Sequence, residues 1–345
     1  MEAVKLLKQY FLADDQFSIQ PIKNGLINAT FEVNDISQNK KFILQKINTH
    51  IFTQPEAIVE NHLTINQNLL ENAYPKRIIS IVPNLSNELL TYDEDGNAWR
   101  MMDYVENSKT LVKVNAESTA EKAAKAFGDF YWHLNQNPIQ LQEVLPHFLD
   151  FQQRMNDFEN AIQNADSSLK QNAQTAIDYL VLHKDLPQQW ILWNKNNTLP
   201  QRIIHADPKI SNILFDANDN PLAIIDLDTA MNATLLYDFG DMVRSYTNLL
   251  DEDSVETDNN FAPEIYSAVK RGFLQPLATL LTPLEIDNLD YAAQVVIYIQ
   301  AVRFLTDYLN GSTYYSTRYE LQNLDRTYNQ IHLLKGLKNH LALNQ

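Results

Sequence analysis

Residues 202–230 constrain the fold of this chain more than any other segment, because they interrupt a long helical pattern with a polar loop. The loop carries Asp207 and Asn212. Two short apolar runs follow it, NILF and LAII, and the second ends at Asp226. Apolar runs of this length on either side of a polar turn predict a β-hairpin. The hairpin would bring its two polar ends, and with them Asn212 and Asp226, to one point.

The spacing of these residues matches the catalytic loop of kinases. His205, Asp207 and Asn212 fit the pattern HxDxxxxN, and Asp226 follows Asn212 by fourteen residues. In kinases the first Asp accepts the proton of the acceptor hydroxyl, while the Asn and the later Asp hold Mg²⁺ and align the ATP phosphates. A polar turn that contains Asp and Asn by chance is the alternative. The apolar runs beside Asp226 favour the kinase interpretation over it.

The first hundred residues predict a small sheet with one main helix. After an opening helix at Ala3–Phe11, apolar and polar positions alternate in residues 19–35 and 40–48. Residues 55–73 have helical spacing and begin with Pro55, which is favoured in a first helical turn. Two further strands are expected. They cover residues 77–84 and 97–105.

Helices dominate after a connector at residues 103–108. They are expected at 116–136, 148–164, 168–183 and from 237 to the end, with a polar loop at 251–260. The predicted class is therefore α+β, a protein-kinase-like fold with two lobes. A small antiparallel-sheet lobe would cover residues 1–104, and a large, mainly helical lobe would cover residues 105–345.

Composition excludes several classes of function. The 345 residues include no cysteine, so disulfides, thiolate nucleophiles and cysteine metal sites are ruled out. A net charge of −16 argues against nucleic acid and anionic membranes as partners. The N-terminus lacks the pattern of a signal peptide, and Tyr291–Leu309 carries too many polar residues for a membrane span. A cytoplasmic location is expected, and the oligomeric state is left open.

The catalytic segment resembles the aminoglycoside phosphotransferase and choline kinase superfamily, whose members are relatives of protein kinases. Within it, the chain is most similar to the N-acetylhexosamine 1-kinase group. The resemblance covers residues 20–335 and rests on six segments: FILQKINTHIFTQPEAIVEN, IIHADPKISNILFD, IIDLDTAM, LLYDFGDMVRS, RFLTDYLNG and RYELQNLDRT. HxDxxxxN is common to the superfamily, whereas RFLTDYLNG together with IDLDT is much narrower.

The resemblance implies a role for each polar residue of the segment. Asp207 is the expected catalytic base, and Asn212 and Asp226 are the expected Mg²⁺ ligands. His205 is expected to be a packed member of the loop. Asp228 lies one strand period after Asp226, so it is expected to face the same side and to contact the metal or the acceptor.

The sequence YDFG at Tyr237–Gly240 spells a protein-kinase motif, but it comes after the hairpin. Asp226, not Asp238, is therefore the expected metal ligand. Asp238 is expected to cap the next helix and to brace the catalytic loop.

The nucleotide-binding half gives a weaker signal. Residues 23–33 contain one glycine, Gly25, and the resemblance implies that backbone N–H groups there, with Asn28 and Thr30, approach the phosphates of ATP. A plain hairpin turn is the alternative. The connector is expected to contact adenine through backbone groups near Asp103 and Val105.

Kinases also place a lysine on a strand of the sheet and pair it with a glutamate of the first helix. Gln45 and Lys46 lie on opposite faces of the expected strand. We expect Lys46 to face ATP with Glu60 as its partner. An inward-facing Gln45 would remove that cation, and two solvated charges are the alternative for Lys46 and Glu60.

Arg303 lies in the apolar run VIYIQAVRFLTDYL, where an unpaired charge would be costly. It needs either a carboxylate or a ligand. An ion pair with Asp307, one helical turn later, is the first option. The resemblance favours the second, with Arg303 and Tyr314 contacting a sugar.

The sequence thus predicts an ATP- and Mg²⁺-dependent kinase that phosphorylates the anomeric hydroxyl of an N-acetylhexosamine. Two alternatives stay open. One is a kinase of the same fold for another acceptor, such as an aminoglycoside, choline or another sugar. The other is a nucleotide-binding module without turnover.

Overall fold

The computed structural model describes residues 2–11, 17–22, 27–256 and 258–343. Its contacts form two compact units. Unit 1 comprises Met1–Thr110, His133–Pro146 and Asn212–Met231, and unit 2 comprises Leu111–Trp132, His147–Ser211 and Asn232–Gln345. Unit 1 therefore includes the hairpin that carries Asp226 as well as the N-terminal region.

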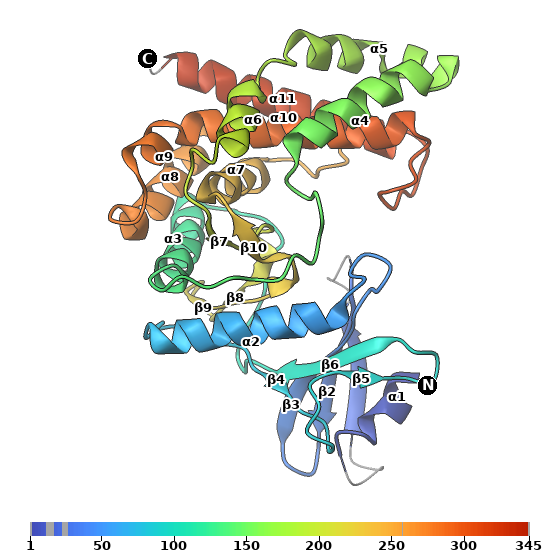
Figure 1. The fold of residues 1–345 in the computed structure, drawn as a ribbon, viewed down its shortest axis with the longest axis vertical. Helices are drawn as coiled ribbons and strands as arrows, with labels where there is room; N and C mark the ends of the chain where they lie inside the picture. Colours follow the sequence, from blue (N-terminus) through green and yellow to red (C-terminus); the bar gives the residue numbers. More distant parts are fainter. Residues whose placement is uncertain (1, 12–16, 23–26, 257, 344–345) are drawn as a thin grey trace. The chain divides into compact units, whose positions relative to one another are not determined.

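The sheet of unit 1 is antiparallel, as expected from the alternating pattern (Figure 1). Its strands run in the order β1-β2-β3-β6-β4, and β5 also pairs with β6. The bounds are β1 Phe17–Ile22, β2 Ala29–Asp35, β3 Lys40–Lys46, β4 Ile81–Val82, β5 Thr91–Tyr92 and β6 Ala98–Asp103. The register places Gln45 of β3 opposite Arg100 of β6. That pairing decides which side chains of the two strands share a face.

Two helices of unit 1 pack with this sheet. Helix α1 (Glu2–Leu7) contributes Leu6 and Leu7 to a core that includes Leu44 and Trp99 of the strands. Helix α2 (Pro55–Glu71) begins at the expected proline and buries Ile58 in a second apolar cluster. Burial of apolar side chains on one face holds each helix in place, at about 25 cal/mol per Å² of apolar surface removed from water.

The expected hairpin is confirmed. Strands β8 (Ile213–Phe215) and β9 (Pro221–Ile224) are antiparallel, with Ile213 opposite Ile224. Ala223 of β9 packs with Ile79 and Val105 in a small apolar cluster, which anchors the hairpin within unit 1. The following 3-10 helix, η2 (Leu227–Thr229), carries Asp228.

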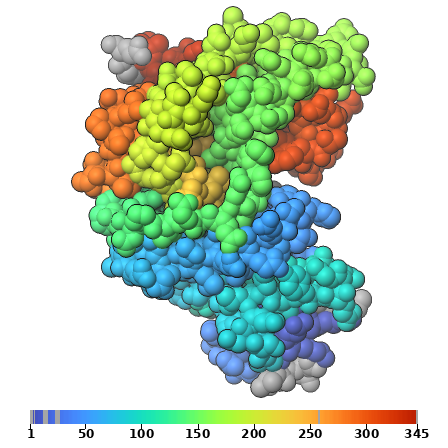
Figure 2. Space-filling model, viewed as in Figure 1, coloured from blue at the N-terminus to red at the C-terminus, as the bar shows by residue number. Residues whose placement is uncertain are grey.

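Unit 2 is mainly helical, which together with the sheet of unit 1 confirms the predicted α+β class. Helix α10 contacts α4, α5, α7 and α11 within it. Helix α4 crosses in front of α10 in the view of Figure 1, α5 lies at the top of that view, and both belong to the green part of the surface in Figure 2. The helices that lie wholly or mostly in it are α3 Glu117–Leu134, α4 Phe151–Asn164, α5 Ser167–Leu182, α6 Gln188–Lys195, α7 Leu235–Tyr246, α8 Pro263–Leu277, α9 Pro283–Asp287, α10 Leu289–Leu309 and α11 Gln322–Leu343. The remaining elements are β7 Arg202–Ile204, η1 Ile210–Asn212 and β10 Met231–Ala233.

Helix α10 is rich in apolar residues, and it is a core helix. Its buried residues include Val295, Tyr298 and Leu305. Across the described ranges, no helix combines the length and the apolar character required to cross a bilayer. The cytoplasmic location stays a prediction.

Buried His62 on α2 makes the stability of unit 1 sensitive to acid. Its Nε2 lies 2.7 Å from the carbonyl oxygen of Ile79, and burial lowers the pKa of His62 to about 4. The unfolded chain would bind a proton near pH 6.5, whereas the folded unit resists it until about pH 4. The stabilisation is therefore present above pH 6.5 and is lost as the pH falls toward 4.

We expect the free energy of unfolding to drop by about 2 kcal/mol more between pH 7 and pH 5 in the wild type than in His62→Gln. Denaturant titrations at several pH values measure this difference. His50→Gln, a change at an exposed position, serves as the control. Equal pH profiles for the wild type and His62→Gln would show that His62 does not resist protonation.

Candidate active site

The loop after β7 holds the expected base in a backbone conformation that a buried carboxylate supports. Ala206 has a φ of +63°, in the left-handed region that non-glycine residues rarely adopt. The carboxylate of Asp238 accepts hydrogen bonds from the backbone N–H groups of His205, at 2.7 Å, and Ala206, at 3.0 Å. These two bonds fix the residues immediately before Asp207.

Asp238 itself is fully buried on α7. The Tyr131 hydroxyl donates to it at 2.5 Å. Burial raises the pKa of Asp238 to about 7, against the lowering effect of its hydrogen-bond donors. The predicted brace is thus present, but the predicted helix cap is wrong: the cap of α7 is Thr234, whose hydroxyl accepts from the N–H of Leu236 at 3.3 Å.

Asp207 is half-buried, and its Oδ2 accepts from the Lys209 ammonium at 2.6 Å. The Tyr246 hydroxyl donates to the carbonyl oxygen of Pro208 at 3.0 Å and so ties the intervening residue to α7. The ring of His205 packs edge-on against Phe127. His205 is fully buried, which agrees with the packed role expected for it.

The expected metal ligands lie at the two ends of the hairpin in unit 1. The backbone carbonyl of Asn212 accepts from the N–H of Ile225 at 3.0 Å, so the residue before Asp226 is bonded directly to Asn212. Asn212 is buried, whereas Asp226 is exposed and has a φ of +63°. One carboxylate and one side-chain amide fit Mg²⁺, which prefers oxygen ligands and keeps several of its waters. Three or more His, Cys, Asp or Glu side chains do not converge on a metal-binding point anywhere in the described ranges.

Asp228 lies in a different setting from the one expected for an acceptor or metal contact. It is 3% exposed, and both of its carboxylate oxygens accept from protein donors, Arg100 at 2.6 Å and Asn28 at 2.8 Å. Buried carboxylates need such partners. The residue therefore serves as an internal anchor two positions after Asp226.

The register of β3 settles which residue faces inward. Gln45 bonds to Thr30 through Nε2, at 3.1 Å, and to the buried guanidinium of Arg100 through Oε1. Lys46 lies over the ring of Trp99, and exposed Glu60 accepts from Gln142. Lys46 and Glu60 thus have separate partners, and Arg100 supplies the buried cation of this region.

The other residues expected to bind the nucleotide are Gly25, Asn28, Asp103 and Val105, and their surroundings differ. Gly25 lies outside the described residues. Asn28 is buried, and its side-chain oxygen accepts from the N–H of Asn48 at 2.9 Å. In the connector, the N–H of Asp103 donates to the carbonyl of Ser80 at 3.0 Å. The Val105 carbonyl accepts from the Ser108 hydroxyl at 2.7 Å.

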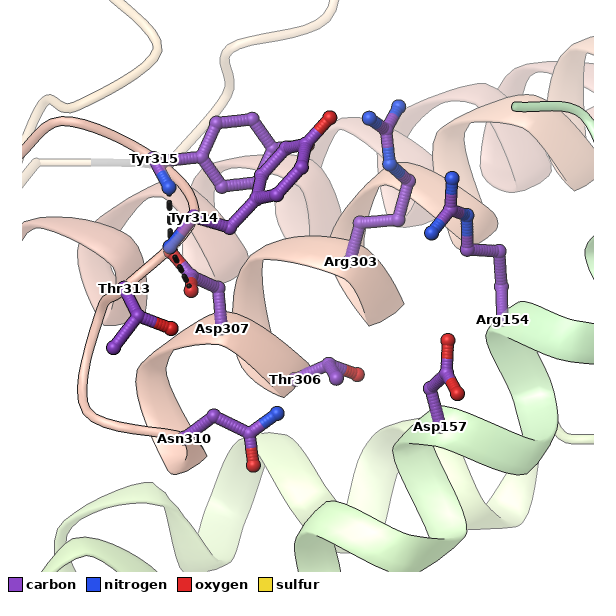
Figure 3. A pocket seen from close by; sticks show the side chains of 9 residues that line it. All are labelled: Arg154, Asp157, Arg303, Thr306, Asp307, Asn310, Thr313, Tyr314 and Tyr315. Atoms are coloured by element: carbon purple, nitrogen blue, oxygen red, sulfur yellow. Dashed lines mark hydrogen bonds between the residues drawn. The ribbon is translucent and has the colours of Figure 1, made fainter. Parts of the chain in front are cut away.

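A cavity of about 150 Å³ in unit 2 brings together Arg303 and Tyr314, two of the three residues expected to contact the acceptor, but not Asp228 (Figure 3). Figure 3 shows the guanidinium groups of Arg154 and Arg303 side by side, one from α4 and one from α10. The nine residues that line the cavity are Arg154, Asp157, Arg303, Thr306, Asp307, Asn310, Thr313, Tyr314 and Tyr315.

Arg303 does not form the ion pair considered as the alternative to a ligand. The carboxylate of Asp307 accepts instead from the backbone N–H groups of Tyr314 and Tyr315, at 2.8 and 2.9 Å, and from the Asn323 amide. Arg303 donates to the neutral Gln300 amide at 3.0 Å, and its guanidinium lies over the Tyr315 ring. The positive charge of Arg303 therefore faces the cavity with a neutral hydrogen-bond partner.

Sequence reasoning missed three basic residues of these sites. Lys209 was identifiable as the cation two positions after the candidate base. Arg100 interrupts an apolar strand, AWRMM, in the same way that Arg303 interrupts an apolar helix. Arg154 has no local signal, because only the packing of α4 beside α10 brings it to the cavity.

A sequence model described as the phosphotransferase enzyme family matches residues 18–262. Among solved structures, the chain is similar to an aminoglycoside phosphotransferase from Alicyclobacillus acidocaldarius, with a TM-score of 0.66, 14% identity, and 98% and 95% of the two chains covered. It is also similar to a microcompartment-associated aminopropanol kinase (TM-score 0.62, 15% identity, 99% and 97% covered). A third likeness is to a spectinomycin phosphotransferase in complex with ADP and spectinomycin (TM-score 0.61, 12% identity, 98% and 97% covered). At these identities the likenesses show a shared fold.

Proposed function

Because the chain belongs to the phosphotransferase enzyme family, we propose that it transfers the γ-phosphoryl group of ATP to the anomeric hydroxyl of an N-acetylhexosamine. The product would be the sugar 1-phosphate and ADP. ATP as donor is supported by the ADP held in the spectinomycin phosphotransferase of the same fold. The identity of the acceptor is proposed from the cavity in unit 2.

Each polar residue has a role in this reaction. Asp207 orients the acceptor hydroxyl and takes its proton as the new O–P bond forms. The Lys209 ammonium lies 2.6 Å from Asp207 Oδ2 and so places a positive charge beside the carboxylate of the base. Asn212 and Asp226 would hold Mg²⁺, which when bound neutralises charge on the phosphate oxygens. The bonds from Asp238 to the loop keep Asp207 in position.

The paired guanidinium groups of the cavity carry the acceptor assignment. Burial, and next the neighbouring charge of Arg303, lower the pKa of Arg154, so the site already carries repelling positive charge. Two carboxylates, Asp157 and Asp307, line the same cavity, but Asp307 already accepts from Tyr314, Tyr315 and Asn323. A cationic acceptor such as choline or an aminoglycoside would still be repelled by the two guanidinium groups. A neutral sugar offers hydroxyl and acetamido oxygens to the guanidinium donors, and the Tyr314 and Tyr315 rings line the same cavity. These contacts favour an uncharged sugar over an amine.

ADP release from Mg-ATP with a panel of acceptors tests the proposal. The panel holds N-acetylglucosamine, N-acetylgalactosamine, glucose, glucuronate, choline and an aminoglycoside, with Asp207→Asn as the blank. We expect release with an N-acetylhexosamine, and ³¹P NMR of the product should locate the phosphate at carbon 1. Release with only choline or the aminoglycoside would overturn the acceptor assignment. ATP binding without release for any acceptor would favour the module without turnover.

Replacing Arg303 with methionine should raise KM for the sugar by about 10- to 100-fold with a smaller change in kcat. Loss of a hydrogen bond to a charged group costs about 1.5–3 kcal/mol, and this bond would form in the ground state and the transition state alike. Steady-state kinetics with varied sugar measures the split. Arg271→Met, at an exposed Arg271–Glu121 pair of the same unit, is the control. An unchanged KM in Arg303→Met would place the acceptor elsewhere.

A further inference from the structure

The guanidinium of Arg100 is buried in the middle of the sheet of unit 1. The residue is 1% exposed and lies on β6. Its Nη2 donates to Asp228 Oδ1 at 2.6 Å, and its Nε and Nη2 donate to Gln45 Oε1 at 3.0 and 2.5 Å. Burying a charged pair is costly and often adds nothing to stability compared with apolar side chains. A pair kept in such a place therefore suggests a role other than stability.

The other carboxylate oxygen of Asp228 is also occupied. It accepts from Asn28 Nδ2 at 2.8 Å, and Asn28 in turn accepts from the N–H of Asn48. Asp228 is thereby tied to β6 on one side and to the segment before β2 on the other. The 3-10 helix η2, which carries Asp228, cannot shift without breaking these bonds.

The residue that benefits from this anchor is Asp226. It has φ +63° and ψ +57°, a left-handed conformation that costs about 1 kcal/mol for a non-glycine residue unless the surroundings hold it. Asp228 follows it by two positions. The backbone N–H of Ile225, on its other side, is bonded to Asn212. The backbone of Asp226, which carries the exposed carboxylate, is therefore held from both sides along the chain.

In protein kinases the sheet of the nucleotide-binding lobe carries a lysine on one strand, and this lysine pairs with a glutamate of the first-lobe helix. Here the residue that faces inward on β3 is Gln45, which is neutral. The buried cation of this chain is instead Arg100 on the neighbouring strand β6, which the register places opposite Gln45. Its carboxylate partner is Asp228, two positions after the expected metal ligand, and not a glutamate of the helix.

We infer that the Arg100–Asp228 pair is a positioning device that sets Asp226 for Mg²⁺ and so couples the nucleotide-binding sheet to the metal. The inference rests on the proposed function, because it takes Asp226 as a metal ligand. Arg100 acts through Asp228 and is not itself a catalytic residue. Its charge matters because a neutral partner would leave the Asp228 carboxylate buried without a cation.

The test is the Mg²⁺ dependence of ADP binding by the full chain, measured by calorimetry at a series of Mg²⁺ concentrations. We expect Arg100→Met and Asp228→Asn each to raise the Mg²⁺ concentration for half-maximal binding at least tenfold. Arg100→Lys keeps the charge but cannot reproduce the planar guanidinium that bonds Asp228 and Gln45 together, so a shift of about threefold is expected. The Arg100→Met/Asp228→Asn double variant should need no more Mg²⁺ for half-maximal binding than the more impaired single variant, because both changes remove the same interaction.

Arg202→Met is the matched control, because it breaks another buried pair, Arg202–Glu285 of unit 2, whose side chains are 9% and 0% exposed. It should lower Tm but leave the Mg²⁺ dependence at the wild-type value. If Arg100→Met behaves like Arg202→Met, the pair only supports the fold and the inference is wrong. If Arg100→Met does not fold, Asp228→Asn decides, since a wild-type Mg²⁺ dependence in that variant overturns the inference.

Asp226→Asn separates failure of the inference from failure of the proposed function. An unchanged Mg²⁺ dependence in Asp226→Asn would remove Asp226 from the metal site and would overturn the inference together with that part of the proposed function. A weakened dependence in Asp226→Asn, combined with a wild-type Mg²⁺ dependence in Arg100→Met and Asp228→Asn, would overturn the inference alone.

Discussion

Asp207→Asn should lower kcat by about 10²- to 10⁴-fold, the usual contribution of a general base, while the affinity for Mg-ATP stays nearly unchanged. The amide keeps the shape of the carboxylate but cannot take the proton of the acceptor hydroxyl. It also leaves the Lys209 ammonium, now 2.6 Å from Asp207, without its anionic partner. Because Asp207 is proposed to contact the acceptor hydroxyl and not the nucleotide, unchanged nucleotide binding would show that the variant is folded.

Steady-state kinetics measures the fall in kcat, and calorimetry measures nucleotide affinity on the same preparation. Asp178→Asn, an exposed change on α5 of the same unit, is the matched control and should keep wild-type kcat. Turnover near the wild-type value in Asp207→Asn would assign the base to another residue. A parallel loss of nucleotide binding would indicate that the variant disturbs the fold as well as the proton transfer.

The hairpin could be predicted from the sequence because its signals are local. Its two apolar runs are separated by a polar turn, and the structure pairs Ile213 with Ile224 as that pattern requires. The strand expected at residues 77–84 is shorter, with only Ile81 and Val82 in β4. The N–H of Arg77 bonds instead to the carbonyl of Leu222, a partner that no local pattern could reveal.

Helix α6 was also missed, because the signal for it is tertiary. It is eight residues long and buries Trp190 and Trp193. A segment this short has little intrinsic helical stability and forms because its aromatic side chains pack against the rest of unit 2. The ring of Phe151 on α4, for example, stacks on the ring of Trp190, with 5.1 Å between the ring centroids. Such packing is visible only once the long helices are in place.

The candidate site divides in the same way. The base and the expected metal ligands lie in one continuous segment, so their spacing could be read directly. The buried cation could not, because the choice between Gln45 and Lys46 depends on strand register, and a slip of one residue exchanges the two faces. Arg100 and Asp228 are 128 residues apart. A charge inside an apolar strand predicts that a partner exists, but not which carboxylate it is.

Asp238→Ala is expected to reduce the free energy of unfolding by about 3–5 kcal/mol, since each buried donor left without an acceptor costs about 1–3 kcal/mol. The variant strands three donors at once: the N–H groups of His205 and Ala206, and the hydroxyl of Tyr131. Denaturant unfolding measures the loss. Turnover should fall as well, by about 10- to 100-fold in kcat, because a shift of about 1 Å in a catalytic loop can cost that much.

Asp307→Ala provides a closely matched comparison within unit 2. Asp307 is also buried, and it also accepts from two backbone N–H groups, those of Tyr314 and Tyr315, and from one side chain, Asn323. Both variants should therefore lose similar stability. Asp238→Ala should act mainly on kcat, through the loop that holds Asp207, whereas Asp307→Ala should act mainly on KM for the sugar. If both variants show the same kinetic change, the loss reflects general loosening of the unit, and Asp238 has no specific part in placing the base.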